Sequence, residues 1–112
     1  MASGIKGSLD AGAGSLDLTS QWELVKASTT TTVIVSACNR NSSADTIRIA
    51  VIPASVTATS GSVANDYFIE YDYSLAANSA LERTGIVLET DARIHVSSAG
   101  GNVSFSCYGL ES

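Results

Sequence analysis

The sequence predicts an all-β fold: a single antiparallel β-sandwich of about seven strands, either a jelly roll or an immunoglobulin-like sandwich. Short segments rich in Val, Ile, Thr and Tyr recur along the chain, most of them 8–14 residues apart. Several of them alternate between apolar and polar residues, as half-buried strands do, and no segment has a helical period. With 112 residues, the chain can bury one core without disulfides.

Three strands are expected before the only proline, at residues 21–26, 29–38 and 45–52. The first mixes Trp22 with aliphatic residues, and the second is rich in Thr and Val, which fit a pleated surface. In the third, Ile47, Ile49 and Val51 share one face. Pro53 should end this strand, because proline cannot donate a ladder hydrogen bond.

Four more strands are expected after a polar loop at 54–65, namely residues 67–73, 80–89, 92–97 and a segment beginning at Val103. Gly85 should kink its strand, because glycine inside a strand commonly marks a bulge. The turn Gly100-Gly101-Asn102 is a hairpin signal. After it, Val103, Phe105 and Cys107 are expected to face the core.

The residues of 92–97 are expected to alternate across their strand. Ile94 and Val96 should point into the core, whereas Arg93, His95 and Ser97 should lie on the solvated face. His95 is the only histidine of the chain, and at this place it is interpreted as a surface residue rather than a catalytic base.

Four side chains of residues 67–73 are expected to line one side of their strand: Tyr67, Ile69, Tyr71 and Tyr73. This face has the period of a buried strand, so core or subunit-interface packing is favoured over an exposed stacking platform for sugar rings. Trp22 is interpreted as a core or interface anchor, because tryptophan buries a large area at a modest entropy cost. Glu70 and Asp72 should share the opposite side, with Cβ atoms about 7 Å apart. Such carboxylates are typical surface charges and can pair with Arg48 or Arg83 across strands.

Residues 1–20 are expected to form a Gly-rich N-terminal arm, flexible in isolation, with the sandwich domain spanning 21–112. The arm holds four of the nine glycines and repeats Gly-Ser-Leu-Asp at 7–10 and 14–17, and glycine at this density costs much chain entropy. Two interpretations remain open. The segment is either a flexible leader or an arm that orders against a neighbouring subunit through Leu9, Leu16 and Leu18.

Charge and composition narrow the kinds of partner. Charged residues make up only 15% of the chain and the net charge is −5, so the surface is inexpensive to desolvate and suits docking. The six basic residues are scattered, which argues against nucleic acid, and the negative charge disfavours an anionic membrane. We find no signal peptide, and no stretch approaches the roughly 20 apolar residues of a membrane span.

No motif for catalysis or metal binding is found. Cys38 and Cys107 are expected to be two buried free thiols, with a disulfide across the sandwich as the alternative. Nothing in the sequence predicts contact between either thiol and His95. The acidic string at 89–91 is too short and unaccompanied to predict a calcium site. We therefore expect no enzymatic activity, no cofactor and no metal.

Four segments carry a family resemblance: Asn39-Arg40, Asp66-Tyr67-Phe68-Ile69-Glu70-Tyr71-Asp72, Leu81-Glu82-Arg83-Thr84-Gly85-Ile86-Val87-Leu88, and Val103-Ser104-Phe105-Ser106-Cys107-Tyr108-Gly109-Leu110-Glu111. With them the chain resembles a group of small virion proteins of tailed bacteriophages, found in marine and cyanobacterial phages. The resemblance covers roughly residues 21–112 and does not include the Gly-Ser-Leu-Asp leader.

The resemblance implies a non-enzymatic structural protein of the virion, assembled in the host cytoplasm. The first expectation is a capsid decoration (cement) protein on the particle surface. The alternatives are a tail, baseplate or fibre-associated module, and a carbohydrate-binding module for host attachment. Expected partners are the major capsid protein or tail proteins, with a homo-oligomer such as a trimer. The residues expected at interfaces are Leu9, Leu16, Leu18, Trp22, Tyr67, Tyr71 and Tyr108.

Overall fold

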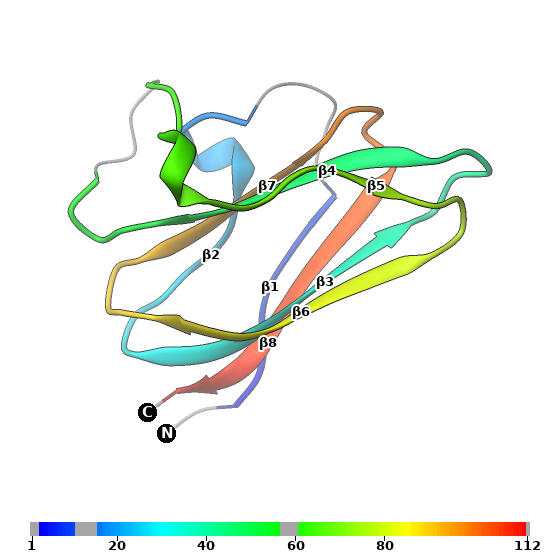
Figure 1. Cartoon of the computed structure of the whole chain (residues 1–112). Coiled ribbons are helices and arrows are strands. Elements are labelled where there is room, and N and C mark those ends of the chain that lie inside the picture. The colour runs from blue at the N-terminus through cyan, green and yellow to red at the C-terminus, as the bar shows by residue number, and fades with distance from the viewer. Residues whose placement is uncertain (1–2, 11–15, 57–60, 112) are drawn as a thin grey trace.

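Eight strands form two antiparallel sheets that pack face to face in the computed structural model, which describes residues 3–10, 16–56 and 61–111 (Figure 1). The strands are β1 (Ser3–Asp10), β2 (Glu23–Lys26), β3 (Thr31–Asn39), β4 (Asp45–Ile52), β5 (Phe68–Leu75), β6 (Ala80–Leu88), β7 (Arg93–Ser98) and β8 (Val103–Glu111). Two short 3₁₀ helices, η1 (Ser20–Trp22) and η2 (Asn65–Tyr67), precede β2 and β5. The predicted antiparallel β-sandwich is confirmed.

The strand order identifies the sandwich as a jelly roll. One sheet has the order β1-β8-β3-β6 and the other β2-β7-β4-β5. The first strand thus pairs with the last, the second with the seventh, the third with the sixth and the fourth with the fifth, as in one long hairpin rolled up. The pairs β3–β8 and β4–β7 then complete each sheet. This order decides between the two predicted topologies.

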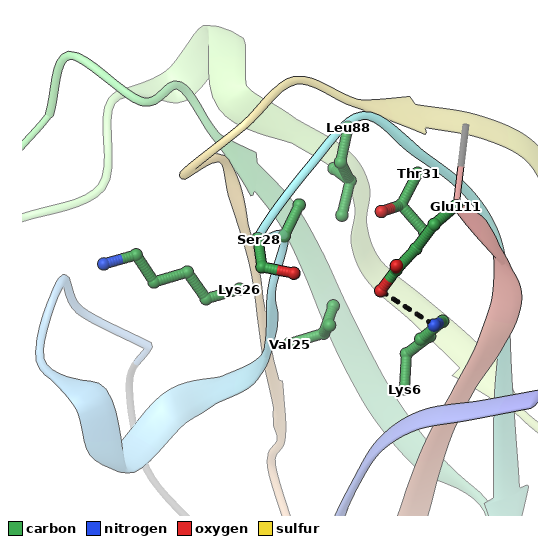
Figure 2. Close-up of a pocket in the computed structure, with 8 residues that line it drawn as sticks. Lys6, Val25, Lys26, Ser28, Thr31, Leu88 and Glu111 are labelled. Atoms are coloured by element: carbon green, nitrogen blue, oxygen red, sulfur yellow. Dashed lines mark hydrogen bonds and ion pairs between the residues drawn. The ribbon is translucent and has the colours of Figure 1, made fainter. Parts of the chain in front are cut away.

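The strand missing from the prediction is β1, inside the segment expected to be an arm. It pairs with β8 along Ser3–Asp10, and the two strands are further joined by an ion pair of 3.0 Å between Lys6 Nζ and Glu111 (Figure 2). A Cβ on Gly7 would overlap the backbone oxygen of Leu24 in β2, so glycine permits this close approach.

The sandwich domain was predicted to begin at residue 21. This boundary is wrong for β1, which precedes it and yet belongs to the first sheet. The entropy cost of glycine was counted for an isolated segment, whereas here the ladder to β8 offsets it. Leu9 also packs against the core between the sheets. Residues 1–2 and 11–15 of the predicted arm lie outside the described residues.

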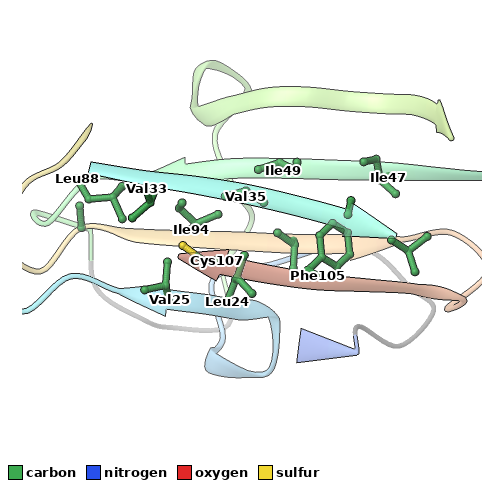
Figure 3. Packing of buried hydrophobic residues seen from close by; sticks show 14 of the residues in the cluster. Leu24, Val25, Val33, Val35, Ile47, Ile49, Leu88, Ile94, Phe105 and Cys107 are labelled. Atoms are coloured by element: carbon green, nitrogen blue, oxygen red, sulfur yellow. The ribbon is translucent and has the colours of Figure 1, made fainter. Parts of the chain in front are cut away.

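The main core lies between the sheets and is built from alternate residues of the facing strands (Figure 3). Its fully buried side chains include Val33, Val35, Ile47, Ile49, Ile94, Val96, Val103, Phe105 and Cys107. The inward positions predicted for β4, β7 and β8 are confirmed, except that Val51 is only half-buried. Burial of this apolar area is the main stabilising term of such a fold.

The outer face of the sheet β2-β7-β4-β5 is covered by the chain itself. Residues 16–22, 53–56 and 61–67, here called the cover, lie over this sheet together with both 3₁₀ helices (Figure 1). A second apolar cluster fills the contact, made of Leu16, Leu18, Trp22, Ala50, Ile52 and Val63. All six residues of β7 are buried as a result.

The cover corrects one prediction. Arg93, His95 and Ser97 do point away from the main core, but they are buried, with exposed fractions of 3%, 0% and 2%. The alternation identified the side of the strand on which they lie. It could not show that a distant segment of the chain covers that side.

All four edge strands are irregular. The register shifts in the pairs that β1, β2, β5 and β6 make with their neighbours, whereas the inner pairs β3–β8 and β4–β7 run without a shift. Gly85 of β6 has φ +72°, which confirms the predicted kink, and Asp72 of β5 has φ +52°. Bulges of this kind disfavour the addition of a further strand at an edge.

One end of the sandwich is fastened by two polar side chains. The connections after β3, β5 and β7 all cross between the sheets there. The buried Asn39 amide donates to three backbone carbonyls, including that of Leu75 at 3.1 Å. Asp45 accepts from the backbone N–H of Gly100 at 2.8 Å. The turn at 100–102 therefore crosses between the sheets, and its interpretation as a hairpin was wrong.

Substitution of Gly7 tests whether β1 belongs to the folded domain. Gly7→Ala should lower the free energy of unfolding by about 1–3 kcal/mol, because the new methyl group overlaps the Leu24 carbonyl. Urea denaturation followed by circular dichroism measures this change. Ser8→Ala, at the exposed neighbouring position, is the control and should be close to neutral. Equal stability of both variants would contradict the close packing of β1 on β2.

Candidate docking surface

The outer face of the sheet β1-β8-β3-β6 exposes apolar side chains from all four strands. Register places Ile5 and Ile34 on either side of Tyr108, and Val87 and Leu110 on either side of Thr32. We call Ile5, Ile34, Val87, Tyr108 and Leu110 the apolar patch. The exposed fractions of Ile5, Val87 and Leu110 are 80%, 62% and 50%. Such a group of neighbouring apolar side chains on one sheet face is typical of a contact surface.

The surroundings of the apolar patch are nearly neutral. Further along the strands the same face carries short side chains: Ser8, Ser36, Cys38, Ala80, Ser104 and Ser106. Glu82 accepts a hydrogen bond of 2.9 Å from the Tyr108 hydroxyl, and this contact raises the pKa of that hydroxyl. Asp10, at the far edge, pairs with Arg40 at 2.7 Å. Few ions would lose water if a protein surface covered this face.

The two sheets thus differ in whether the chain covers their outer faces. The cover occupies one, while no described segment of the chain lies over the apolar patch. Because the edges are bulged, this bare face is the part of the described surface best suited to a broad contact.

The predicted interface residues differ in their exposure to solvent. Leu16, Leu18 and Trp22 are each 7% exposed, because they belong to the cover and pack in the second apolar cluster against the sheet. Leu9 and Tyr67 are half-buried against the main core and the second cluster. Of the remaining two, Tyr71 is 57% exposed on β5, and Tyr108 belongs to the apolar patch.

The other members of the apolar patch were not among the predicted interface residues: Ile5, Ile34, Val87 and Leu110. Ile34 and Val87 break the alternation of their strands by placing an apolar residue on the outer side. This break in the alternation is the feature of the sequence that indicates an exposed apolar surface. An apolar residue at an outward position of an alternating strand cannot reach the core. Ile5 gave no signal, since its strand was not predicted.

Tyr71 lies in a small aromatic and charged cluster on β5. The Arg48 guanidinium carbon is 4.1 Å from the Tyr71 ring centroid, and the Phe68 ring meets Tyr71 edge-on at 4.9 Å. A shallow hollow of about 320 Å³ is lined by these two rings and Asn65. Tyr71 and Tyr108 belong to different sheets, so they do not form one flat aromatic platform.

Glu70 and Asp72 do not share a face as predicted. The bulge of β5 turns Asp72 towards Arg48, at 2.6 Å, which lowers the pKa of this carboxyl. Glu70 instead pairs with Arg83 of the opposite sheet. The predicted ion pairs with the two arginines are confirmed, but the shared face is wrong, because a bulge reverses the alternation that follows it.

The two thiols differ in environment. Both are free, Cys107 is buried as predicted, and burial raises its pKa to about 11. Cys38 is exposed, contrary to the prediction, because its inward-facing neighbour Ala37 fills the core position. His95 binds the backbone oxygen of Asp17 rather than a thiol or carboxylate.

A cavity of about 160 Å³ opens at the end of the sandwich opposite Asn39, beside Val25, Thr31 and Leu88 (Figure 2). Lys6 and Glu111 bind each other within it, and Lys26 points away from it. Its charges are therefore already neutralised. Within residues 3–10, 16–56 and 61–111, no group of three or more His, Cys, Asp and Glu could hold a metal ion.

The fold and the surface define a jelly-roll protein with one bare, weakly charged sheet face. No protein-family model, curated protein or solved structure matches the chain. The resemblance to phage virion proteins thus depends on the quoted segments alone. Over the described residues, no helix has the length and apolar character needed to cross a membrane.

Thiol titration tests the two environments. In the native protein at about pH 8, Cys38 should react readily with a disulfide reagent, whereas Cys107 should react at least about 100-fold more slowly. Cys38→Ser and Cys107→Ser variants assign the two reactions. Fast labelling of Cys107 in the folded protein would contradict the closed core.

Proposed function

We propose that this chain is a non-enzymatic structural protein of a tailed-bacteriophage particle, a capsid decoration (cement) protein that docks through the apolar patch. The observation that carries the proposal is the bare, nearly neutral face of the sheet β1-β8-β3-β6. The expected partners are the major capsid protein and further copies of this chain, for example in a trimer.

Surface chemistry supports a protein partner. The apolar patch has no ionised side chain, so burying it against another protein desolvates little charge. A stable interface needs roughly 800 Å² from each partner, and the outer face of the four-stranded sheet β1-β8-β3-β6 is the proposed site of this contact. A particle repeats each contact many times, so a modest affinity per copy suffices.

The fold adds support by analogy only. Jelly rolls occur in viral capsid proteins but also in lectins and enzymes, so the strand order does not by itself select a function. A tail, baseplate or fibre position would use the same face. The carbohydrate-binding alternative has less support, because Trp22 is buried and Tyr71 and Tyr108 lie on different sheets.

Charged substitutions in the apolar patch test the proposal. Ile5→Glu and Val87→Glu should weaken binding to particles of the encoding phage by at least about tenfold, because each buries a carboxylate in the contact. Both side chains are exposed in the free chain, so its stability should change little. Ala54→Glu adds the same charge at an exposed position of the cover, away from the apolar patch, and should bind normally. Co-sedimentation with particles measures binding.

Cys38 reports on the same face without any substitution. Its labelling should be protected in assembled particles and free in the isolated monomer. Sedimentation of the free protein separates contacts between copies from contacts with the capsid. Normal binding by both patch variants, with Cys38 still labelled on the particle, would refute the proposed docking face. Particle images that place the chain only on tails would refute the capsid assignment.

A further inference from the structure

Two outward side chains of β7 connect its sheet to the cover. His95 Nδ1 lies 2.9 Å from the backbone oxygen of Asp17, and Arg93 donates to the backbone oxygen of Val56 at 2.7 Å. Residues 16–22 and 61–67 of the cover are themselves joined, since the Leu18 N–H donates to the Gly61 carbonyl at 3.1 Å. His95 and Arg93 therefore hold one connected structure over the sheet.

The contact at Asp17 fixes the proton on the His95 ring. A carbonyl oxygen only accepts, so Nδ1 must donate and the neutral ring carries its lone pair on Nε2. The residue is 0% exposed, and no atom of the described residues is a hydrogen-bond partner of Nε2. A second proton would therefore create a buried cation with an unpaired N–H.

The charges around His95 do not compensate for this burial. Arg93 on the same strand opposes protonation, whereas Glu23 on β2 and Asp17 on the cover favour it. Asp17 already accepts from Thr19, and Ala50, the neighbour on β4, carries no charge. Desolvation is the largest effect and, despite the favourable bond to Asp17, holds the pKa of His95 below its ordinary value of 6.5.

The cover packs in an apolar cluster of its own and not in the main core. Its apolar cluster lies on the outer side of the sheet and is distinct from the core between the sheets. Opening would expose Ile52 and Trp22 to solvent and leave Phe105 and Cys107 enclosed.

We propose that His95 is an acid-sensitive latch: its protonation releases the cover from the outer face of the sheet β2-β7-β4-β5 while the jelly roll stays folded. This inference does not depend on the proposed docking function.

The direction of the pH effect follows from the two protonation states. Above about pH 6.5 the imidazole is neutral in both the closed and the open forms, and the latch holds. Below that pH the exposed imidazole of the open form takes up a proton that the closed form resists. The ratio of open to closed molecules should then rise by up to about tenfold per pH unit, until the closed form is protonated too.

The chain contains its own reporter of this change. Trp22 is the only tryptophan and is 7% exposed, because it packs between the cover and the sheet. Lowering the pH from about 7.5 to about 5 should shift its emission to longer wavelength and increase quenching by acrylamide, reversibly. Cys107, measured in a Cys38→Ser variant, should remain unreactive over the same range, because the main core stays closed.

His95→Gln is the matched variant. The glutamine amide can donate to the Asp17 carbonyl but does not titrate, so the acid response of Trp22 should disappear. NMR titration of the imidazole in the unsubstituted protein, whose only histidine is His95, provides a second measurement that needs no variant. Its midpoint should coincide with the Trp22 transition.

Three results would overturn the latch. The first is an unchanged Trp22 signal over this range, and the second is the same acid response in a folded His95→Gln protein. The third is labelling of Cys107 with the same midpoint as the Trp22 change, which would indicate unfolding of the whole domain.

Discussion

Each sheet of a two-layer sandwich has one face in the core and one outer face. The rest of this structure depends on whether the chain itself covers that outer face. The sheet β2-β7-β4-β5 is covered by the chain itself, so its central strand β7 is buried on both sides. The sheet β1-β8-β3-β6 is not covered, and its apolar patch is open to solvent. Arg93 and His95 enter the first region, and each bonds a backbone carbonyl of the cover.

The sequence predicted those parts of the fold that depend on local alternation. Ile47, Ile49, Phe105 and Cys107 were placed in the core correctly, because their strands keep a period of two. Strand β1 was not predicted, because a glycine-rich segment has little intrinsic preference for a strand. Ser3–Asp10 becomes a strand through its pairing with β8, which lies about a hundred residues further along the chain.

The candidate surface was only partly predictable. Tyr108 was selected, but Trp22, Leu16 and Leu18 pack within the chain, because an apolar residue serves an intramolecular cover and an intermolecular contact equally well. The environment of His95 also depends on the path of the backbone, since its partner Asp17 is remote in sequence. The positions of Glu70 and Asp72 depend on a bulge that periodicity does not reveal.

The irregular edges of both sheets also affect how this protein behaves when it is abundant. Unpaired strand edges with regular geometry can recruit other chains into open-ended fibrils, particularly when many copies accumulate in one compartment. Here the left-handed conformation of Asp72 and the glycine at position 85 deform two of those edges, and register shifts deform the other two. Polymerisation of accumulated chains edge to edge by strand addition should therefore be disfavoured.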